Sequence, residues 1–441
     1  MNTKGTKMNP IARELNEAIK KENENIFSML SRMGKELFFP KGILSQSAEA
    51  KTKAHKINAT IGVAKENDHL MVLKSIMEEI PNIAPENSLA YAPSFGLPAL
   101  RNAWKEEQFE KNPSLAGKGT SLPIVTNGIT HGLSIFADVW TDAGDLVILP
   151  DLFWGNYNLI MKTRKNLNFE TYKTFNNSGG FNTEAFDSLL KKESKGRDKI
   201  IVILNFPHNP SGYSITQQEA KELSDSIIEV AKSGTKVIAV TDDAYFGLFF
   251  EDETSKESLF SKLAGADKNL LAIKLDGATK ENFVWGLRCG FITYAANTNN
   301  REFYEALEKK TAGCIRGNIS NASHLGQTLI LKSMQSESYK SQKKEKFEIL
   351  KARANKVKEV VNSEKYKDHF KAYPFNSGYF MCIELFKNVN AEELRLHLLD
   401  KYGVGLISID NKNLRVAFSS IEVEDIIPLF DAIYDGINDL A

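Results

Sequence analysis

The sequence has 441 residues, and its 56 lysines and arginines balance 56 aspartates and glutamates, so the formal net charge is zero. At roughly 100–200 residues per domain, this length predicts two or three domains. A neutral balance gives no general attraction to nucleic acid or to an anionic membrane. The proportions of hydrophobic residues (42%) and charged residues (25%) are typical of a globular chain and exclude a disordered one.

Three cysteines, Cys289, Cys314 and Cys382, are too few and too scattered for a disulfide framework. Their odd number and the lack of a C-x-x-C pair favour reduced thiols and disfavour a cysteine-based zinc site, so we expect no metal. The start, MNTKGTKMNPIAREL, is not followed by the apolar segment of a secretory signal. No stretch reaches the roughly 18 apolar residues of a membrane-spanning helix. Together these features predict a cytoplasmic protein.

Residues 10–37 carry dense charge, with apolar residues at helical spacing at Ile26, Leu30, Met33 and Leu37. This spacing predicts one amphipathic helix. Such a helix is more often a packing or dimer element than a functional site.

From about residue 120, short apolar runs alternate with amphipathic stretches, which is typical of an α/β domain with a mostly parallel sheet sandwiched by helices. The predicted helices include 130–140, 182–193 and 216–233. The predicted strands are 123–127, 145–150, 199–206, 236–242, 270–276 and 288–294. Several are apolar on both faces, as expected of strands covered by helices on each side.

After about residue 320, long polar stretches predict helices, and a second strand–helix set follows from 377 to the end of the chain. This set predicts a smaller α+β domain, to which the N-terminal segment also contributes. We therefore expect three regions: 1–65, with the N-terminal helix and a segment that covers the substrate; 66–340, the large cofactor-binding domain; and 341–441, the small domain.

Ligands of α/β sheets bind beyond the carboxyl ends of the strands, and polar residues gather at these ends here. In TNGITHGLSIF (126–136), Gly128 permits a tight turn before a helix that begins near Thr130. Such a turn suits a phosphate group, although it is often only a turn. Trp154 follows the next strand, where it either covers a flat ring or packs in the core.

Two further strand ends carry polar side chains. NFPHNPSG (205–212) forms a rigid turn in which Asn209 is able to donate to a ligand oxygen. The strand KVIAV leads into TDDAYFG (241–247), which places Asp242 and Tyr245 at the same edge. A buried carboxylate there requires a partner, and the alternative is an ordinary turn aspartate.

The last strand end is LDGATKENFVWGLRCGF (275–291). Lys280 follows a turn of small residues, where burial or neighbouring cations lower the pKa of a nucleophilic lysine. Arg288, eight residues later, suits a phosphate. Taken singly, both residues read as surface charges.

The order of these motifs on successive strands resembles the fold-type I, pyridoxal-phosphate-dependent aminotransferases of class I, and is most similar to the aspartate and aromatic aminotransferases. The resemblance covers about residues 57–420. It implies that Lys280 forms the Schiff base with pyridoxal 5′-phosphate and moves the proton, while Asp242 pairs with the pyridine nitrogen. Tyr245 and Asn209 would hydrogen-bond the phenolic oxygen of the ring, and Trp154 would stack on it.

The resemblance also implies a phosphate site and a shared active site in a homodimer. Gly128, Ile129, Thr130 and Arg288 would hold the phosphate group. Tyr91, in YAPSFGLPALRNAW (91–104), would complete that site from the partner subunit.

Substrate recognition in the family uses two arginines. Arg415, in NLRVAFSS, resembles the arginine that binds the α-carboxylate; without the family, an edge-strand arginine facing water would be the expected reading. Arg316, in CIRGNISNASHLG (314–326), resembles the one that binds the distal carboxylate of aspartate or glutamate across the dimer interface. Ile61 and Gly62, in INATIGVAKE (57–66), would lie at the edge of the pocket, in the mobile segment that covers the substrate. The substrates would be amino acids and 2-oxo acids.

Two positions depart from the family pattern: Gly277 replaces a Ser or Thr that contacts the phosphate, and Ser211 replaces a commoner Thr. The leading hypothesis is a ping-pong aminotransferase acting on aspartate or glutamate. An aromatic aminotransferase, a β-lyase or a decarboxylase on the same scaffold is the alternative. A cofactor-binding regulator is a remote one, because no helix-turn-helix precedes the match, and the absence of G-x-G-x-x-G after the first strand disfavours a nicotinamide dehydrogenase.

Overall fold

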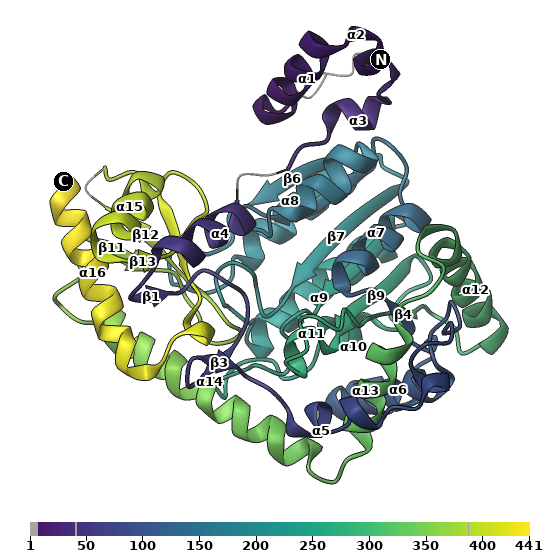
Figure 1. Ribbon diagram of the computed structural model, residues 1–441. Helices are drawn as coiled ribbons and strands as arrows, with labels where there is room; N and C mark the ends of the chain where they lie inside the picture. The colour runs from purple at the N-terminus through teal and green to yellow at the C-terminus, as the bar shows by residue number, and fades with distance from the viewer. Residues whose placement is uncertain (1–7, 40–41, 387) are drawn as a thin grey trace.

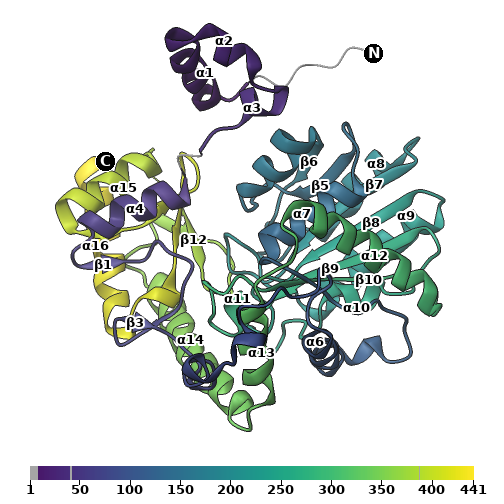
Figure 2. The same cartoon turned by 45° about the vertical axis from the view of Figure 1, so that its right-hand side comes forward.

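The computed structural model describes residues 8–39, 42–386 and 388–441. The expectation about a leader at the start of the chain therefore falls largely outside the described residues. The chain forms a large sheet and a smaller one, and the long helix α14 (Tyr339–Val361) leads from the side of the large sheet to the C-terminal part of the chain (Figures 1 and 2).

The large sheet has seven strands in the order β4-β10-β9-β8-β7-β5-β6. Only β10 runs antiparallel to its neighbours; the other contacts are parallel. The strands are β4 (Ile124–Thr126), β5 (Leu146–Pro150), β6 (Asn168–Tyr172), β7 (Lys199–Asn205), β8 (Lys236–Asp242), β9 (Leu270–Gly277) and β10 (Gly290–Ala295). The predicted mostly parallel α/β architecture is thus confirmed.

Alternate residues of each central strand serve different cores, which is why these strands are apolar on both faces. On β7, Ile200, Val202 and Leu204 join the core beneath α8, α9 and α10, whereas Ile201 and Ile203 join the core beneath α7. These helices are α7 (Ile129–Trp140), α8 (Thr183–Ser194), α9 (Gln217–Lys232) and α10 (Leu259–Leu263). α12 (Arg301–Asn318) packs on α7.

The smaller sheet is antiparallel, in the order β11-β12-β15-β14. Its strands are β11 (Phe370–Ala372), β12 (Met381–Leu385), β14 (Ile407–Ser408) and β15 (Asn413–Val416). Beside it, β1 (Ile57–Asn58) pairs in parallel with β13 (Val404–Gly405), so an early segment of the chain joins the C-terminal part. The helices α4 (Ile43–Lys53), α15 (Ala391–His397) and α16 (Ile426–Leu440) pack around them.

The prediction of one helix over 10–37 is wrong, because the segment forms α1 (Pro10–Glu22), α2 (Glu24–Met29) and α3 (Arg32–Glu36). Asn23 is extended, and its side chain accepts from the Ile26 N–H, so it ends one helix and caps the next. Ser31 caps α3 in the same way. Figures 1 and 2 show these helices projecting from the rest of the molecule.

The remaining strands and α-helices include α11 (Ala278–Glu281), which directly follows the end of β9. The others are the hairpin of β2 (Lys65–Glu66) and β3 (His69–Leu70), and the helices α5 (Lys74–Met77), α6 (Pro98–Lys111) and α13 (His324–Gln335).

Candidate active site

Lys280 lies on the short helix α11, directly after strand β9. Its Nζ lies 4.9 Å from the centre of the Tyr245 ring. Burial lowers the pKa of Lys280 to about 8, an effect that Asp242 opposes and Arg288 reinforces. The lysine is therefore neutral more often near pH 7 than a surface lysine, as a nucleophile requires.

Asp242 ends strand β8, with 3% of its surface exposed. The Tyr157 hydroxyl donates to Asp242 Oδ2 at 2.6 Å, and the Ala244 N–H donates to Oδ1 at 3.3 Å. Burial raises the pKa of Asp242 to about 6, and the hydrogen bond from Tyr157 and the charge of Lys280 counteract that rise. A carboxylate held this way is suited to a cationic ligand group.

Tyr157 and Asn205 contact Asp242 directly and are candidate site residues that the sequence did not single out. Tyr157 follows Trp154 by three residues at helical spacing, and that spacing was the only signal. The rings of Tyr157 and Trp154 meet edge to face, with centroids 5.6 Å apart. Tyr157 therefore links Trp154 to Asp242. Asn205 donates from Nδ2 to the Asp242 carbonyl (2.7 Å), and its Oδ1 accepts from the Asn209 N–H (2.8 Å).

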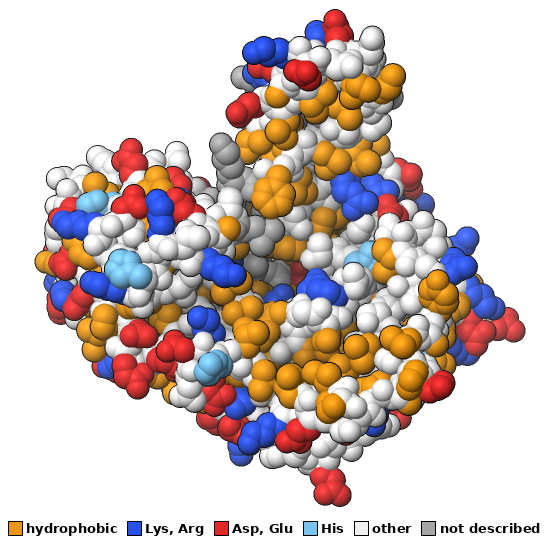
Figure 3. All heavy atoms as spheres, in the orientation of Figure 1, with side chains coloured by type: hydrophobic (Ala, Val, Ile, Leu, Met, Phe, Trp, Pro, Cys, Tyr) orange, Lys and Arg blue, Asp and Glu red, His pale blue; other side chains and the backbone are white. Residues whose placement is uncertain are grey.

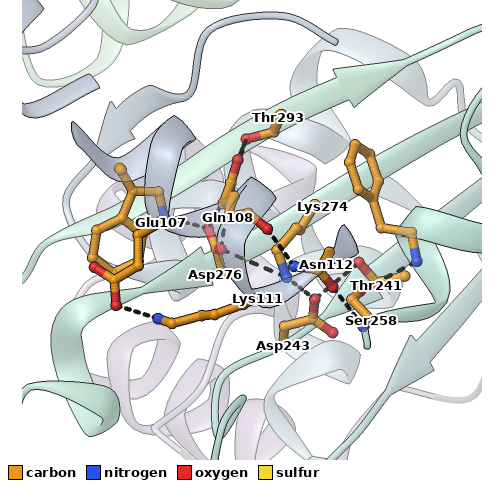
Figure 4. A network of polar contacts seen from close by, with 12 residues as sticks. Glu107, Gln108, Lys111, Asn112, Thr241, Asp243, Ser258, Lys274, Asp276 and Thr293 are labelled. Atoms are coloured by element: carbon orange, nitrogen blue, oxygen red, sulfur yellow. Dashed lines mark hydrogen bonds and ion pairs between the residues drawn. The ribbon is translucent and has the colours of Figure 1, made fainter. Parts of the chain in front are cut away.

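A network of charged and polar side chains includes Asp243, the residue after Asp242 (Figure 4). Lys274 is 1% exposed and forms ion pairs with Asp243 and, at 3.6 Å, with Asp276. Gln108 donates to Asp276 Oδ2 at 3.0 Å. Because Asp243 follows Asp242 directly, this network fixes the end of β8.

The turn between β4 and α7 brings Gly128 against Arg288. Gly128 has φ +80°, and a Cβ there would lie 2.3 Å from Arg288 Nη2, so only glycine fits. Ile129 and Thr130 begin α7, where backbone N–H groups favour an anion. Arg288 also donates from Nη1 to the Trp285 carbonyl at 3.1 Å.

Arg415 lies on β15 and is 2% exposed, so it does not face water as an edge-strand arginine would. Its Nη2 donates to the Thr60 carbonyl at 2.9 Å, and its Nη1 lies 3.5 Å from Asn209 Oδ1. The Phe380 ring covers the guanidinium, 4.0 Å from Cζ. The buried Nε has no partner among the described residues, which leaves a donor for a ligand.

Gly62 also borders this pocket. A Cβ at Gly62 would lie 3.0 Å from Phe380 Cζ and 3.8 Å from the Tyr245 hydroxyl, whereas Ile61 beside it is 44% exposed. The Tyr245 ring packs against Phe380 at 5.5 Å. The structure therefore brings Lys280, Asp242, Tyr245, Asn209, Arg415 and Gly62 together.

Two predicted site residues lie apart from this cluster. Tyr91 is 89% exposed. Arg316 is exposed near the end of α12, where its Nη1 donates to Ser320 Oγ at 2.6 Å. Within the described ranges, no hydrogen bond or ion pair joins either residue to Arg415, Asp242 or Lys280.

The residues present fit pyridoxal 5′-phosphate. Thr279 Oγ1 is buried and has no partner among the described residues, so it offers the hydroxyl that Gly277 lacks. A Cβ at Gly277 would lie 2.7 Å from the Cys289 carbonyl, which explains the glycine. The anion turn at Gly128 and the carboxylate of Asp242 match the phosphate and the protonated ring nitrogen of this cofactor, and the free donor on Arg415 matches the carboxylate of an amino acid.

Neither a metal-ligand cluster nor a membrane-spanning helix occurs among the described residues. No group of three or more His, Cys, Asp or Glu side chains there is arranged to hold a metal ion. No helix among them has both the length and the apolar character needed to cross a membrane.

Comparisons with known proteins relate this chain to one family. The family model for aminotransferase class I and II matches residues 54–433. The aspartate aminotransferase of Bacillus sp. (strain YM-2) is 25% identical over 262 residues, 59% of this chain and 63% of that relative. The match thus spans less than two thirds of the length of that curated protein.

Solved structures share the fold over nearly the whole chain. The aminotransferase of Anaerococcus prevotii DSM 20548 has a TM-score of 0.83 at 23% identity, covering 93% of this chain and 99% of that one. The kynurenine aminotransferase of Pyrococcus horikoshii has a TM-score of 0.77 at 16% identity, covering 94% and 98%. Since the family model matches most of its length, the chain belongs to the aminotransferase class I and II family.

Proposed function

We propose that the protein is a pyridoxal-phosphate-dependent aminotransferase. The observation that carries this proposal is the convergence of Lys280, Asp242 and Arg415 from three different elements on one buried site. Family membership supports the choice of cofactor. The bound cofactor would supply an electron-withdrawing ring that stabilises negative charge at the substrate α-carbon.

The roles of the cofactor-holding residues follow from their chemistry. Asp242 would keep the ring nitrogen protonated, and Tyr245 and Asn209 would hydrogen-bond the phenolic oxygen. Trp154 would cover the ring. Gly128, Ile129, Thr130, Thr279 and Arg288 would bind the phosphate, with Tyr91 from a partner subunit.

Lys280 would act as both nucleophile and proton carrier. Because burial lowers its pKa to about 8, a useful fraction of Nζ is unprotonated near neutral pH. Nζ would take the proton from the α-carbon of the amino acid and return it at a neighbouring carbon. Arg415 would hold the α-carboxylate and so fix the face that the α-carbon presents to Lys280.

The substrate class depends on the second arginine. We propose that Arg316 of a partner subunit binds the side-chain carboxylate of aspartate or glutamate, with Ile61 and Gly62 covering the pocket. The relatives named aspartate aminotransferases support this preference. An aromatic aminotransferase remains the alternative substrate class, and a β-lyase or decarboxylase the alternative reaction.

A homodimer is part of the proposal. Leu89 and Tyr91 are 84% and 89% exposed, an unusual state for large apolar side chains that lie close together in sequence. Figure 3 shows hydrophobic side chains gathered on one face of the molecule, where α6, α11 and α13 lie in Figure 1. The regions 1–65, 66–340 and 341–441 as domains, and a cytoplasmic location, stay predictions from the sequence.

The test is transfer of an amino group from L-aspartate to 2-oxoglutarate, with oxaloacetate and glutamate measured as products. We expect wild-type protein with added cofactor to form both, and Lys280→Ala to form neither. Arg316→Leu should lose activity with aspartate while sparing aromatic amino acids. Near wild-type transfer by Lys280→Ala would contradict the role of the lysine, and equal loss on both substrate classes would contradict that of Arg316.

A further inference from the structure

The residue after Lys280 is held by two lysines from two other helices. Glu281 is 8% exposed and forms ion pairs with Lys111 of α6 and, at 2.8 Å, with Lys343 of α14. Burial raises the pKa of Glu281, but the two lysines outweigh burial and lower it below the usual value. Because α11 has only four residues, this carboxylate is a principal anchor of the turn that carries Lys280.

Glu107 completes a group with equal numbers of positive and negative charges. It forms ion pairs with Lys111, on its own helix, and with Lys343 at 3.2 Å. Figure 4 shows Glu107 and Lys111 pointing toward each other. Two carboxylates and two ammonium groups shielded from water hold their geometry more strongly than exposed pairs do.

The same helix α14 is also bonded to the loop that follows β15, the strand of Arg415. Arg353 is fully buried, and its Nη1 donates to the Ser419 carbonyl at 2.8 Å and to the Lys65 carbonyl at 2.7 Å. Its Nη2 bonds Glu422 at 2.5 Å. Ser419 lies four residues after Arg415, and its hydroxyl donates to the Val63 carbonyl at 2.8 Å.

Arg353 therefore fixes both segments that surround the Arg415 guanidinium. One is the loop that follows β15. The other is the covering segment, residues 58–66, whose Thr60 carbonyl accepts from Arg415. The Ala417 N–H also donates to the Ala59 carbonyl at 2.9 Å. In this structure the covering segment is bonded to the Arg415 strand rather than free of it.

We propose that α14 is a spacer that sets the distance between Lys280 and Arg415, with Lys343 and Arg353 as its two positioning residues. They are ten residues apart on one helix, which corresponds to about 15 Å along its axis. This inference rests on the proposed function, in which the α-carboxylate binds Arg415 while the adjacent α-carbon reacts at Lys280. A misplacement of about 1 Å between such groups costs on the order of 10²-fold in rate.

The two ends of the spacer predict different defects, which are measured on the cofactor-loaded dimer. Lys343→Met removes the bond between α14 and Glu281 and leaves Glu281 paired with Lys111 of α6 alone. We therefore expect kcat to fall about tenfold and the kinetic isotope effect of α-deuterated L-glutamate to rise. Binding of maleate, a dicarboxylate probe of the arginine site, should stay within about twofold of wild type, because Arg415 is undisturbed.

Arg353→Lys keeps a positive charge at this buried position, so that the protein still folds. The shorter lysine side chain cannot donate to the Ser419 and Lys65 carbonyls together as the guanidinium does. We expect the Kd for maleate to rise about tenfold with an unchanged isotope effect. The matched control for both variants is Lys340→Met. It removes an exposed ion pair between α14 and α6, which Lys340 forms with Glu110 at 2.5 Å. It should change neither quantity.

The spacer would be supported if Lys343→Met changed only the isotope effect and Arg353→Lys changed only the binding of maleate. The spacer would be refuted if both variants behaved like Lys340→Met, or if each variant changed both the isotope effect and the Kd for maleate. In either case the wild-type enzyme would still transaminate. A wild-type protein that failed to bind the cofactor would instead refute the proposed function, so the two failures are distinguishable.

Discussion

At the scale of single residues, the hydrogen bond from Tyr157 to Asp242 helps to set the charge of that carboxyl, a contact that the sequence did not predict. A neutral hydroxyl donates a 2.6 Å hydrogen bond to a buried carboxylate that has few other donors. That bond favours the ionised form of Asp242, which is the form that a protonated ring nitrogen needs.

Tyr157→Phe is therefore expected to weaken cofactor binding. A hydrogen bond to a charged group contributes about 1.5–3 kcal/mol, so the affinity for pyridoxal 5′-phosphate should fall about 10- to 100-fold. Fluorescence titration of the cofactor-free protein measures it. Tyr304→Phe is the control, since its buried hydroxyl donates instead to the Gly119 carbonyl at 2.8 Å. Unchanged affinity in Tyr157→Phe would refute the pairing as a functional contact.

Asp242 also predicts how the stability of the cofactor-free protein depends on pH. Burial raises its pKa from 3.8 to about 6, so the carboxyl costs no stability below pH 3.8. The cost then grows as the pH rises through 6 and is complete above it. Asp242→Asn should consequently raise the free energy of unfolding by about 2–3 kcal/mol at pH 8.

Urea denaturation at pH 8 and near pH 4 measures this difference, which should shrink to less than about 1 kcal/mol at the lower pH. Asp252→Asn, on an exposed turn, serves as the control. A gain of equal size at both pH values would show that the raised pKa is not its cause.

At the scale of elements, the approach of β10 to β9 explains one departure from the family. A Cβ at Gly277 would lie 2.7 Å from the Cys289 carbonyl and 2.8 Å from Gly290 Cα, both of them backbone atoms. Gly277→Ala should lower the free energy of unfolding by about 1–3 kcal/mol, because the strands must separate. Gly313→Ala, where a Cβ meets nothing within 4 Å on α12, is the matched control and should not destabilise.

The sequence pattern predicted the central strands but not the edge strand β6 or the three N-terminal helices. The central strands were predictable because alternate residues fill two cores, which makes long apolar runs. Strand β6 was missed because it is an edge strand with mostly exposed polar residues. The division of residues 10–37 into three helices depends on the caps at Asn23 and Ser31, which the apolar spacing does not register.

For the site, motif order identified Lys280, Asp242 and Arg415, and the structure brings them together with Asn209 and Tyr245. Sequence could not reveal Tyr157, Lys343 or Arg353. Their importance comes from contacts between residues far apart in the sequence, and no local pattern encodes such contacts. Tyr157 and Asp242 are 85 residues apart, and Arg353 and Ser419 are 66 residues apart.

At the scale of the whole molecule, the exposure of Arg316 predicts active sites shared between subunits. Lys280→Ala and Arg316→Leu are each expected to be inactive on aspartate. After subunit exchange, random pairing makes half of the dimers mixed, and each mixed dimer has one intact site, so about a quarter of wild-type activity should return. No recovery despite exchange, followed by mass spectrometry, would place Arg316 outside the partner's site.

An absorption spectrum tests most directly whether Lys280, Asp242 and Arg415 together make an amino-group transfer site. Purified protein with pyridoxal 5′-phosphate should show a visible band that depends on Lys280. Adding L-aspartate or L-glutamate should convert it to the shorter-wavelength band of pyridoxamine phosphate, with release of the oxo acid. A band that responds only to aromatic amino acids would remove Arg316 from the substrate site. No band at all, with the cofactor in excess, would contradict the account.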